Sequence, residues 1–229
     1  MPMKGTLINV AAILGGTSLG MLLETRMPDR VSHVVIQGIG MFTVFLGIRF
    51  ALQTQSILTT LFSLVIGGII GAVLNIEGHL ERIATRLEAR LATQQSQIAE
   101  GFLTATLLFC VGPMAIIGSL EDGISGNYQI LVTKSVMDGF CSIAFGAAMG
   151  IGVALSAVAV LVYQGGLTVL SSVMEQVLTD AAIIEMTATG GLLIVGIGLD
   201  MLGIKKIQVA DLLPAIAVAP ILIRLLPRL

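Results

Sequence analysis

The stretch FCVGPMAIIGSLEDGISGNYQILVTKSVMDG, residues 109–139, decides how this chain is organised. It begins inside a long apolar run, which Gly112 and Pro113 interrupt. A proline removes one helical hydrogen bond and clashes with the preceding turn, so the stretch predicts a broken helix. In lipid, such a break persists only where protein or a cavity covers the freed carbonyl groups. Many transporters build their binding sites from a broken helix and nearby polar groups.

Charged residues follow the predicted break in two places. An acidic turn contains Glu121 and Asp122, and the next apolar segment carries Lys134 and Asp138. Residues four apart lie on one face of a helix, so Lys134 and Asp138 are expected to pair. A charge at the bilayer centre costs about 2.5–3.5 kcal/mol on insertion scales. The pair therefore indicates either self-neutralisation near the interface or a site at which a cation or proton competes for Asp138.

The composition of the whole chain is that of a membrane protein. Of its 229 residues 55% are hydrophobic and 11% are charged, and the mean hydropathy is +1.00. A soluble domain usually carries about 25% charged residues. The net charge of −2 gives no basic face for nucleic acid. Cysteine spacing indicates neither a disulfide framework nor a metal site, and enzyme signatures are missing, so we expect no enzyme, cofactor or metal.

Apolar runs of about 20 residues predict an all-α, polytopic transmembrane helical bundle of about eight spans. The predicted spans are 5–23, 34–52, 56–75, 101–120, 130–149, 152–171, 186–203 and 208–227. Residues 139–171 contain no charge and could instead form one long helix with a re-entrant segment, so seven spans are the alternative. The acidic segment 172–185, which includes Glu185, is interpreted as an external or interfacial loop.

Segment 76–99 differs from the rest because it is rich in charge. Apolar residues recur at helical spacing from Ile76 to Leu91, with acidic and basic residues between them. This pattern predicts an amphipathic helix on the membrane surface, followed by a polar exit. Loop lysines and arginines place that helix in the cytoplasm and both termini outside if there are eight spans. With seven spans, the charge balance is about as good.

The chain is interpreted as a single membrane domain, 1–229, with four parts. A first half of three spans (1–75) precedes the amphipathic helix and its exit (76–99), the broken and charged helices (100–150) and a second half of three spans (151–229). Gly40-x6-Gly47 resembles Gly191-x6-Gly198, which predicts an internal repeat between the halves. The repeat would be inverted with eight spans and parallel with seven, and chance similarity between glycine-rich segments is the alternative.

Glycine pairs and buried polar residues complete the sequence evidence. Pairs spaced as Gly16-x3-Gly20 predict close packing of helices inside the protein. Polar residues within spans are usually paired or functional, although those near helix ends can reach the interface. Gln164 is one such residue. The candidate residues for binding a solute or ion are Asn9, Gly112, Pro113, Glu121, Asp122, Lys134, Asp138, Asp200 and Asp211.

Four motifs resemble an uncharacterised bacterial integral membrane family, domain of unknown function 554, with YqgA-like and YdfK-like members. The motifs are FCVGPMAIIGSLEDG (109–123), KSVMDG (134–139), YQGGLTVL (163–170) and VADLLPAI (209–216). The resemblance implies a bacterial inner-membrane protein and carries over no binding residue. The family pattern often has Asn at the position of Asp211 and varies at Asp200, which argues against a shared proton-carrying role for either acid.

Together these features predict a membrane transporter of a small solute or ion in the bacterial inner membrane. A membrane scaffold or channel-like subunit without coupled transport is the alternative. The expected partners are the lipid bilayer and an unknown small solute or ion, without nucleic acid. The sequence is also compatible with a homo-oligomer.

Overall fold

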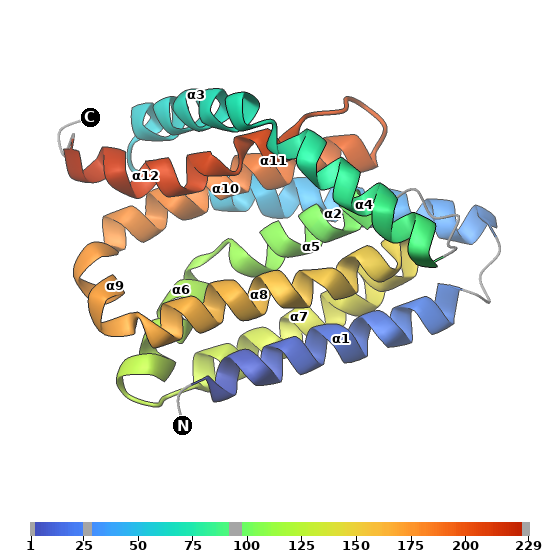
Figure 1. The fold of residues 1–229 in the computed structure, drawn as a ribbon, viewed down its shortest axis with the longest axis horizontal. Coiled ribbons are helices and arrows are strands. Elements are labelled where there is room, and N and C mark those ends of the chain that lie inside the picture. Colours follow the sequence, from blue (N-terminus) through green and yellow to red (C-terminus); the bar gives the residue numbers. More distant parts are fainter. Residues whose placement is uncertain (1–2, 25–28, 92–97, 226–229) are drawn as a thin grey trace. The chain divides into compact units, whose positions relative to one another are not determined.

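A computed structural model describes residues 3–24, 29–91 and 98–225, and every element within these ranges is an α-helix (Figure 1). The predicted all-α class is therefore confirmed. The helices are α1 (Lys4–Glu24), α2 (Asp29–Ala51), α3 (Ile57–Leu74), α4 (Ile76–Leu91), α5 (Ile98–Cys110), α6 (Pro113–Ile124), α7 (Gln129–Met149), α8 (Ile151–Val169), α9 (Ser171–Val177), α10 (Asp180–Met201), α11 (Val209–Leu212) and α12 (Pro214–Leu225).

Six of the described helices are long and apolar enough to cross a membrane: α1, α2, α3, α7, α8 and α10. The pair α5 and α6 adds a seventh crossing if the two helices count as one bent span. The eighth predicted span is divided into α11 and α12 at Leu213, and residues 226–229 lie outside the described chain. The choice between seven and eight spans therefore stays a prediction.

The predicted break in the fourth span is confirmed. α5 ends at Cys110 and α6 begins at Pro113, and the two helices meet at a bend of 60°. Proline suits the first helical position because its missing N–H would have no partner there. Gly112 has φ of 130°, a conformation that favours glycine, and it is buried together with Val111. The interrupted backbone thus lies inside the protein.

The chain forms two compact units that interleave along the sequence. Unit 1 comprises Met1–Ile36 and Gln97–Val177, and unit 2 comprises Gln37–Ser96 and Leu178–Leu229. Each unit therefore combines segments from both predicted halves. The reason is that helices pack mainly on partners distant in sequence. The predicted division of the chain into four parts stays a prediction.

In unit 1, α1 and α7 lie side by side and run in the same direction (Figure 1). Gly5 packs against Leu131, and farther along both helices Gly16 packs against Gly139. A Cβ atom added to Gly16 would lie 2.4 Å from the Gly139 carbonyl oxygen, so only glycine permits this approach. α5 and α6 pack on α8, and a turn at Gly150, with φ of 64°, separates α7 from α8. Residues 139–171 are therefore two helices.

In unit 2, glycines again bring helix backbones together. Gly47 of α2 packs against Gly191 of α10, and Gly198 of α10 packs against Gly40. The two helices are therefore antiparallel, and the four glycines of the predicted repeat contact one another. Gly71 of α3 approaches α11 so closely that an added Cβ atom would lie 1.8 Å from the backbone oxygen of residue 211. The predicted internal packing of glycine pairs is confirmed, whereas the repeat stays a prediction.

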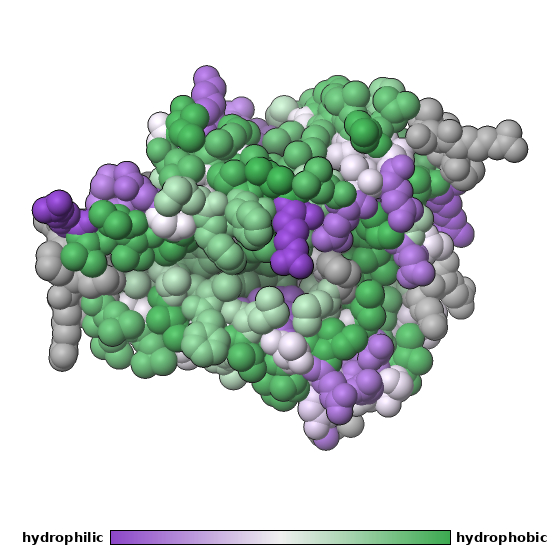
Figure 2. Space-filling view, turned by 180° about the vertical axis from the view of Figure 1, so that it is seen from behind, coloured by the Kyte–Doolittle hydropathy of each residue, from purple (hydrophilic) through white to green (hydrophobic). Residues whose placement is uncertain are grey.

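Large apolar side chains remain exposed on the described helices. Examples are Phe45 of α2 at 59% exposure and Val73 of α3 at 80%. Apolar residues cover most of the face shown in Figure 2, and hydrophilic residues gather in patches on it. Exposed apolar surface on this scale is typical of a protein that contacts lipid.

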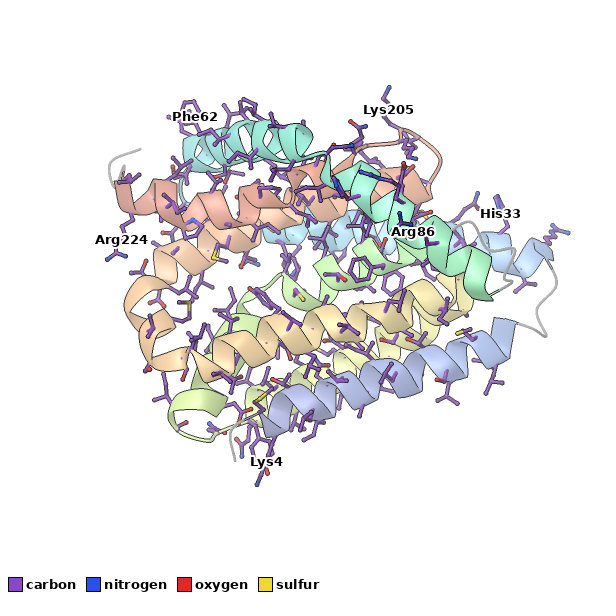
Figure 3. The ribbon with its side chains drawn as sticks, viewed as in Figure 1. Lys4, His33, Phe62, Arg86, Lys205 and Arg224 are labelled. Atoms are coloured by element: carbon purple, nitrogen blue, oxygen red, sulfur yellow. The ribbon has the colours of Figure 1, made fainter. Side chains whose placement is uncertain are left out.

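The positive charges of unit 2 are divided between its two ends. Lys206 Nζ lies 3.4 Å from Glu81 Oε1, so α4 and the loop after α10 share one end of the unit. Figure 3 shows Arg86 and Lys205 toward this end and Arg224 at the opposite end of the unit. This distribution agrees with the arrangement predicted for eight spans. The cytoplasmic and interfacial position of α4 stays a prediction, and its polar exit at 92–97 lies outside the described residues.

Candidate functional site

A buried ion pair lies in α7 of unit 1. Lys134 and Asp138 are 6% and 7% exposed, and Lys134 Nζ donates a hydrogen bond to Asp138 Oδ2. The predicted pairing of these two residues is confirmed. The Lys134 ammonium also lies 5.9 Å from the centre of the Phe109 ring, within range of a cation–π interaction.

Two buried amides complete this site. Asn9 Nδ2 of α1 donates to Asp138 Oδ2 at 2.9 Å and to Gln164 Oε1 of α8 at 3.3 Å. We call Asn9, Lys134, Asp138 and Gln164 the polar core cluster. Three helices thus bring together residues up to 155 positions apart in sequence. The first three were candidates on sequence grounds, whereas Gln164 stood out only as a polar residue in a span.

The polar core cluster retains unused hydrogen-bonding capacity. Asn9 Oδ1 and Gln164 Nε2 are buried and have no partner. A buried polar atom without a partner costs about 1–3 kcal/mol, and native proteins carry few of them. One free acceptor and one free donor therefore remain beside a charged pair, an arrangement suited to a small polar ligand or to ordered water.

The break in the fourth span borders the polar core cluster. Phe109, whose ring faces Lys134, is fully buried and lies one residue before the last position of α5. Because Pro113 has no N–H, the Phe109 carbonyl lacks its usual helical donor. Gly112 and Pro113 thus lie within one turn of a residue whose ring contacts the cluster, and the contact itself is made by Phe109.

The two acids of the predicted acidic turn have different surroundings. Asp122 is 1% exposed, and its Oδ2 accepts a hydrogen bond of 3.2 Å from the backbone N–H of Gly5 at the start of α1. Glu121 is partly exposed, and its Oε2 accepts from Asn127 Nδ2 at 3.1 Å in the turn before α7. Asp122 thus belongs to the interior of unit 1, whereas Glu121 belongs to its surface.

The remaining candidates, Asp200 and Asp211, belong to unit 2. Asp211 Oδ1 accepts from the backbone N–H of Glu77 at 2.9 Å, and Glu77 Oε2 accepts from the backbone N–H of Ala210 at 2.9 Å. The two acids thus cap the first turns of α4 and α11 reciprocally. Burial raises the pKa of Glu77. Asp200 is half-buried in the last turn of α10.

Glu185 is a buried acid that was not among the predicted site residues. The loop predicted over 172–185 is wrong over most of its length. α9 extends to Val177, and α10 begins at Asp180, because Thr179 caps this helix and Asp180 favours its first turn. Glu185 is 1% exposed and accepts four hydrogen bonds from the turn between α2 and α3 and from the first turn of α3, which together we call the Glu185 cradle. The donors are Thr54 Oγ1 (2.8 Å), Gln55 N (2.8 Å), Ser56 N (3.0 Å) and Thr60 Oγ1 (3.0 Å).

A sequence signal for Glu185 was present. The apolar run Ala181–Ile184 precedes it directly, which would have extended the seventh predicted span upstream. The donors of the cradle, by contrast, are backbone amides and hydroxyl groups that have no recognisable motif.

Comparison with known proteins supplies the family. The family described as "Protein of unknown function (DUF554)" matches residues 4–224. The chain belongs to the DUF554 family. It is 32% identical over 225 residues to the uncharacterized membrane protein YdfK of Bacillus subtilis (strain 168), covering 96% of both chains. It is 26% identical over 220 residues to the uncharacterized protein YqgA of Escherichia coli (strain K12), covering 94% of both chains.

The family resemblance inferred from sequence is thereby confirmed. No solved structure matches the chain. The apolar helices and the membrane relative together make this DUF554 member a membrane protein. The family description assigns no activity, so the chemistry of the site rests on its residues.

Proposed function

We propose that this protein transports a small solute or ion across the bacterial inner membrane, and that the polar core cluster binds the transported species. One observation carries the proposal. Within an apolar helical unit, a buried ion pair adjoins two buried amides, each with an unused polar atom.

The energetics of the cluster favour a functional role. Two charges and two amides are costly in a membrane, and an apolar set of similar volume would stabilise the same helices more cheaply. A cation or proton that competes for Asp138 would release Lys134, and the free oxygen of Asn9 could then help to coordinate the newcomer. The cluster would then have two arrangements that differ in ligand occupancy, as a transport site requires.

The break between α5 and α6 supports the same proposal. Broken helices line the sites of many transporters because they offer backbone groups that a continuous helix would use internally. Here the end of α5 contacts the polar core cluster through Phe109 and Lys134. We propose transport rather than catalysis because Lys134 and Asp138 neutralise each other and leave no free acid, base or nucleophile in the cluster.

A scaffold or channel-like subunit is the second candidate. The observation that favours it is that Asp138 accepts hydrogen bonds from both Lys134 and Asn9 without any ligand. In this alternative the cluster only specifies how α1, α7 and α8 pack.

A binding screen with variants distinguishes the two candidates. Purified full-length protein is screened by thermal shift against ions and metabolites, because a ligand that binds the folded state raises its melting temperature. Asp138→Asn and Lys134→Met each leave a buried charge unpaired and should cost about 3–5 kcal/mol of stability. The double variant should recover much of this stability and should lose the response to the ligand.

The control for this screen is Glu121→Gln, which removes an acid from the surface of the same unit and should keep the wild-type response. If the double variant folds and binds the ligand as tightly as the wild type, the cluster is structural. That outcome would favour the scaffold.

The proposed orientation is tested by labelling in intact cells. Arg86→Cys on α4 should resist a membrane-impermeant thiol reagent, since α4 is proposed to face the cytoplasm. Lys4→Cys, close to the external N-terminus, should react in the same cells. Both tests are made with Cys110 and Cys141 replaced. Labelling of Arg86→Cys from outside would reverse the orientation.

A further inference from the structure

Three buried oxygen atoms near the start of α1 lack hydrogen-bond partners. They are Thr6 Oγ1 of α1, Asp122 Oδ1 of α6 and Thr168 Oγ1 of α8. All three residues are at most 2% exposed. We call them the Asp122 oxygen set. Asp122 is the one carboxylate that leaves a buried oxygen unpaired in the ranges that the structure describes.

Backbone contacts place the three helices together at this level of unit 1. Gly5, the neighbour of Thr6, donates its N–H to Asp122 Oδ2. Gly123, the neighbour of Asp122, would place an added Cβ atom 2.3 Å from the Thr168 carbonyl oxygen. The start of α1, the end of α6 and the end of α8 therefore meet at the Asp122 oxygen set.

The chemistry of this set suits a hard cation. It consists of oxygen atoms alone, which hard cations prefer over nitrogen and sulfur. It holds one carboxylate, whereas protein sites for divalent ions usually combine several charged or carbonyl oxygens. Asp122 and Thr168 lie in the last turns of α6 and α8, where the helix dipoles favour positive charge. One negative charge with neutral hydroxyl groups matches a single positive charge.

We propose that an alkali cation binds to Thr6, Asp122 and Thr168. The ion would neutralise a carboxylate that receives one hydrogen bond, and it would use the unpaired oxygen atom of each of the three residues. This site goes beyond the proposed function, because it does not include Lys134 or Asp138 and does not depend on what the polar core cluster binds. A bound cation here would hold α1, α6 and α8 together.

The test is thermal unfolding of the full-length protein in alkali salts. Sodium, lithium and potassium chloride are titrated at constant pH, with choline chloride keeping the ionic strength constant. The expected result is a melting temperature that rises and saturates with at least one alkali cation and does not rise with choline. Asp122→Asn should abolish this rise, and Thr6→Val and Thr168→Val should each weaken the apparent affinity severalfold.

Two control variants distinguish cation binding at this site from a general effect of charge and from binding in the polar core cluster. Glu121→Gln makes the same charge change at the adjacent surface residue and should keep the full response. Asp138→Asn should also keep it, even if it abolishes binding in the polar core cluster, so the two proposals can fail independently.

The wild-type titration alone can overturn the inference, so a poorly folded variant does not block the test. A melting temperature that is equal in sodium, lithium, potassium and choline would exclude an alkali cation. So would a temperature that depends on pH alone, which would indicate a proton on Asp122, or an undiminished response in Asp122→Asn or in both threonine variants.

Discussion

Glu185 in unit 2 and Asp122 in unit 1 are both buried carboxylates beside the start of a helix, but the protein satisfies them differently. The two oxygens of Glu185 accept four hydrogen bonds from the Glu185 cradle at the start of α3. Asp122 accepts one hydrogen bond, from the start of α1, and one of its oxygens has no partner. The same kind of group is thus completed by protein in one unit and left incomplete in the other.

This difference distinguishes buried polar groups that stabilise the fold from buried polar groups that can bind a ligand. A buried carboxylate with a full set of donors stabilises the fold and gains nothing from a ligand. Unit 1 instead holds an incompletely bonded carboxylate and two incompletely bonded amides, and its ligands would supply the missing interactions. If this distinction is correct, substitutions of these groups should differ in kind: Glu185 variants should lose stability, whereas Asp122 and Gln164 variants should mainly lose binding.

The largest effect is expected for Glu185→Met. The methionine side chain has a similar length but no carboxylate, so the cradle loses its acceptors, and each buried donor left unsatisfied costs about 1–3 kcal/mol. We expect a total loss on the order of 3–5 kcal/mol, measured by thermal or chemical unfolding. Asp180→Leu, at an exposed position of the same helix, is the control for loss of a carboxylate and should cost far less. A Glu185→Met loss as small as that of the control would show that the cradle is not structural.

An intermediate effect is expected at the glycine contacts, and it should be similar in both units. Gly16→Ala in unit 1 and Gly71→Ala in unit 2 each push a methyl group into a facing backbone oxygen. Overpacking of this kind typically costs about 1–3 kcal/mol. Gly15→Ala is the control, because no atom lies within 4 Å of its added Cβ. Unequal costs would mean that the units differ in packing as well as in polarity.

A smaller effect is expected for Gln164→Leu, which tests the incompletely hydrogen-bonded groups of unit 1. The substitution removes one weak hydrogen bond to Asn9, but it also removes a buried nitrogen that has no partner. The two changes offset each other, so stability should shift by no more than about 1 kcal/mol. Binding of the solute or ion found in the screen should weaken. A large loss of stability would place Gln164 with Glu185 among the structural groups.

The smallest effect is expected for Glu77 in unit 2, whose buried carboxylate should make the stability of the protein depend on pH. Burial raises the pKa of Glu77, so the folded state binds its proton more tightly than the unfolded state does. The stability contribution of this group is therefore lowest above the raised pKa and improves as the pH falls toward the unfolded value. Because Glu77 is partly solvated, we expect less than about 0.5 kcal/mol.

The measurement for Glu77 is the difference in unfolding free energy between the wild type and Glu77→Gln across mildly acidic pH. The wild type should gain stability relative to the variant as the pH falls. Glu81→Gln, one turn later on the same helix, serves as the control. A difference that grows as the pH rises would reverse the assigned direction.

Local features of the site were predictable from the sequence. Gly112 and Pro113 predicted the break because proline cannot continue the hydrogen-bonding pattern of a helix. The four-residue spacing of Lys134 and Asp138 predicted their pairing because it places both side chains on one helix face. Both predictions required only neighbouring residues, and both are confirmed.

Features that depend on distant contacts were not predictable. Asn9 was a candidate, but its bond to Asp138 spans 129 residues and follows from how α1 packs on α7. Asp211 looked like an ion-binding acid, and its observed bond caps α4 across 134 residues. Glu185 was placed in a loop because acids usually mark exposed segments, and the backbone donor at Gln55 lies 130 residues earlier.

The interleaving of the two units sets the order in which the protein can be completed during synthesis. All the segments of unit 1 have emerged from the ribosome soon after residue 177 has been made, whereas unit 2 still lacks α10, α11 and α12. At that stage α3 has already been made. The helices α11 and α12, which pack on its glycine face in the complete unit, have not yet emerged. Domains generally fold as units during synthesis. Ribosome-bound chains that are just long enough to expose residue 177 should therefore contain a protease-resistant unit 1 and an incomplete unit 2. We expect membrane chaperones and proteases to act on the protein at this stage, before α10, α11 and α12 have packed.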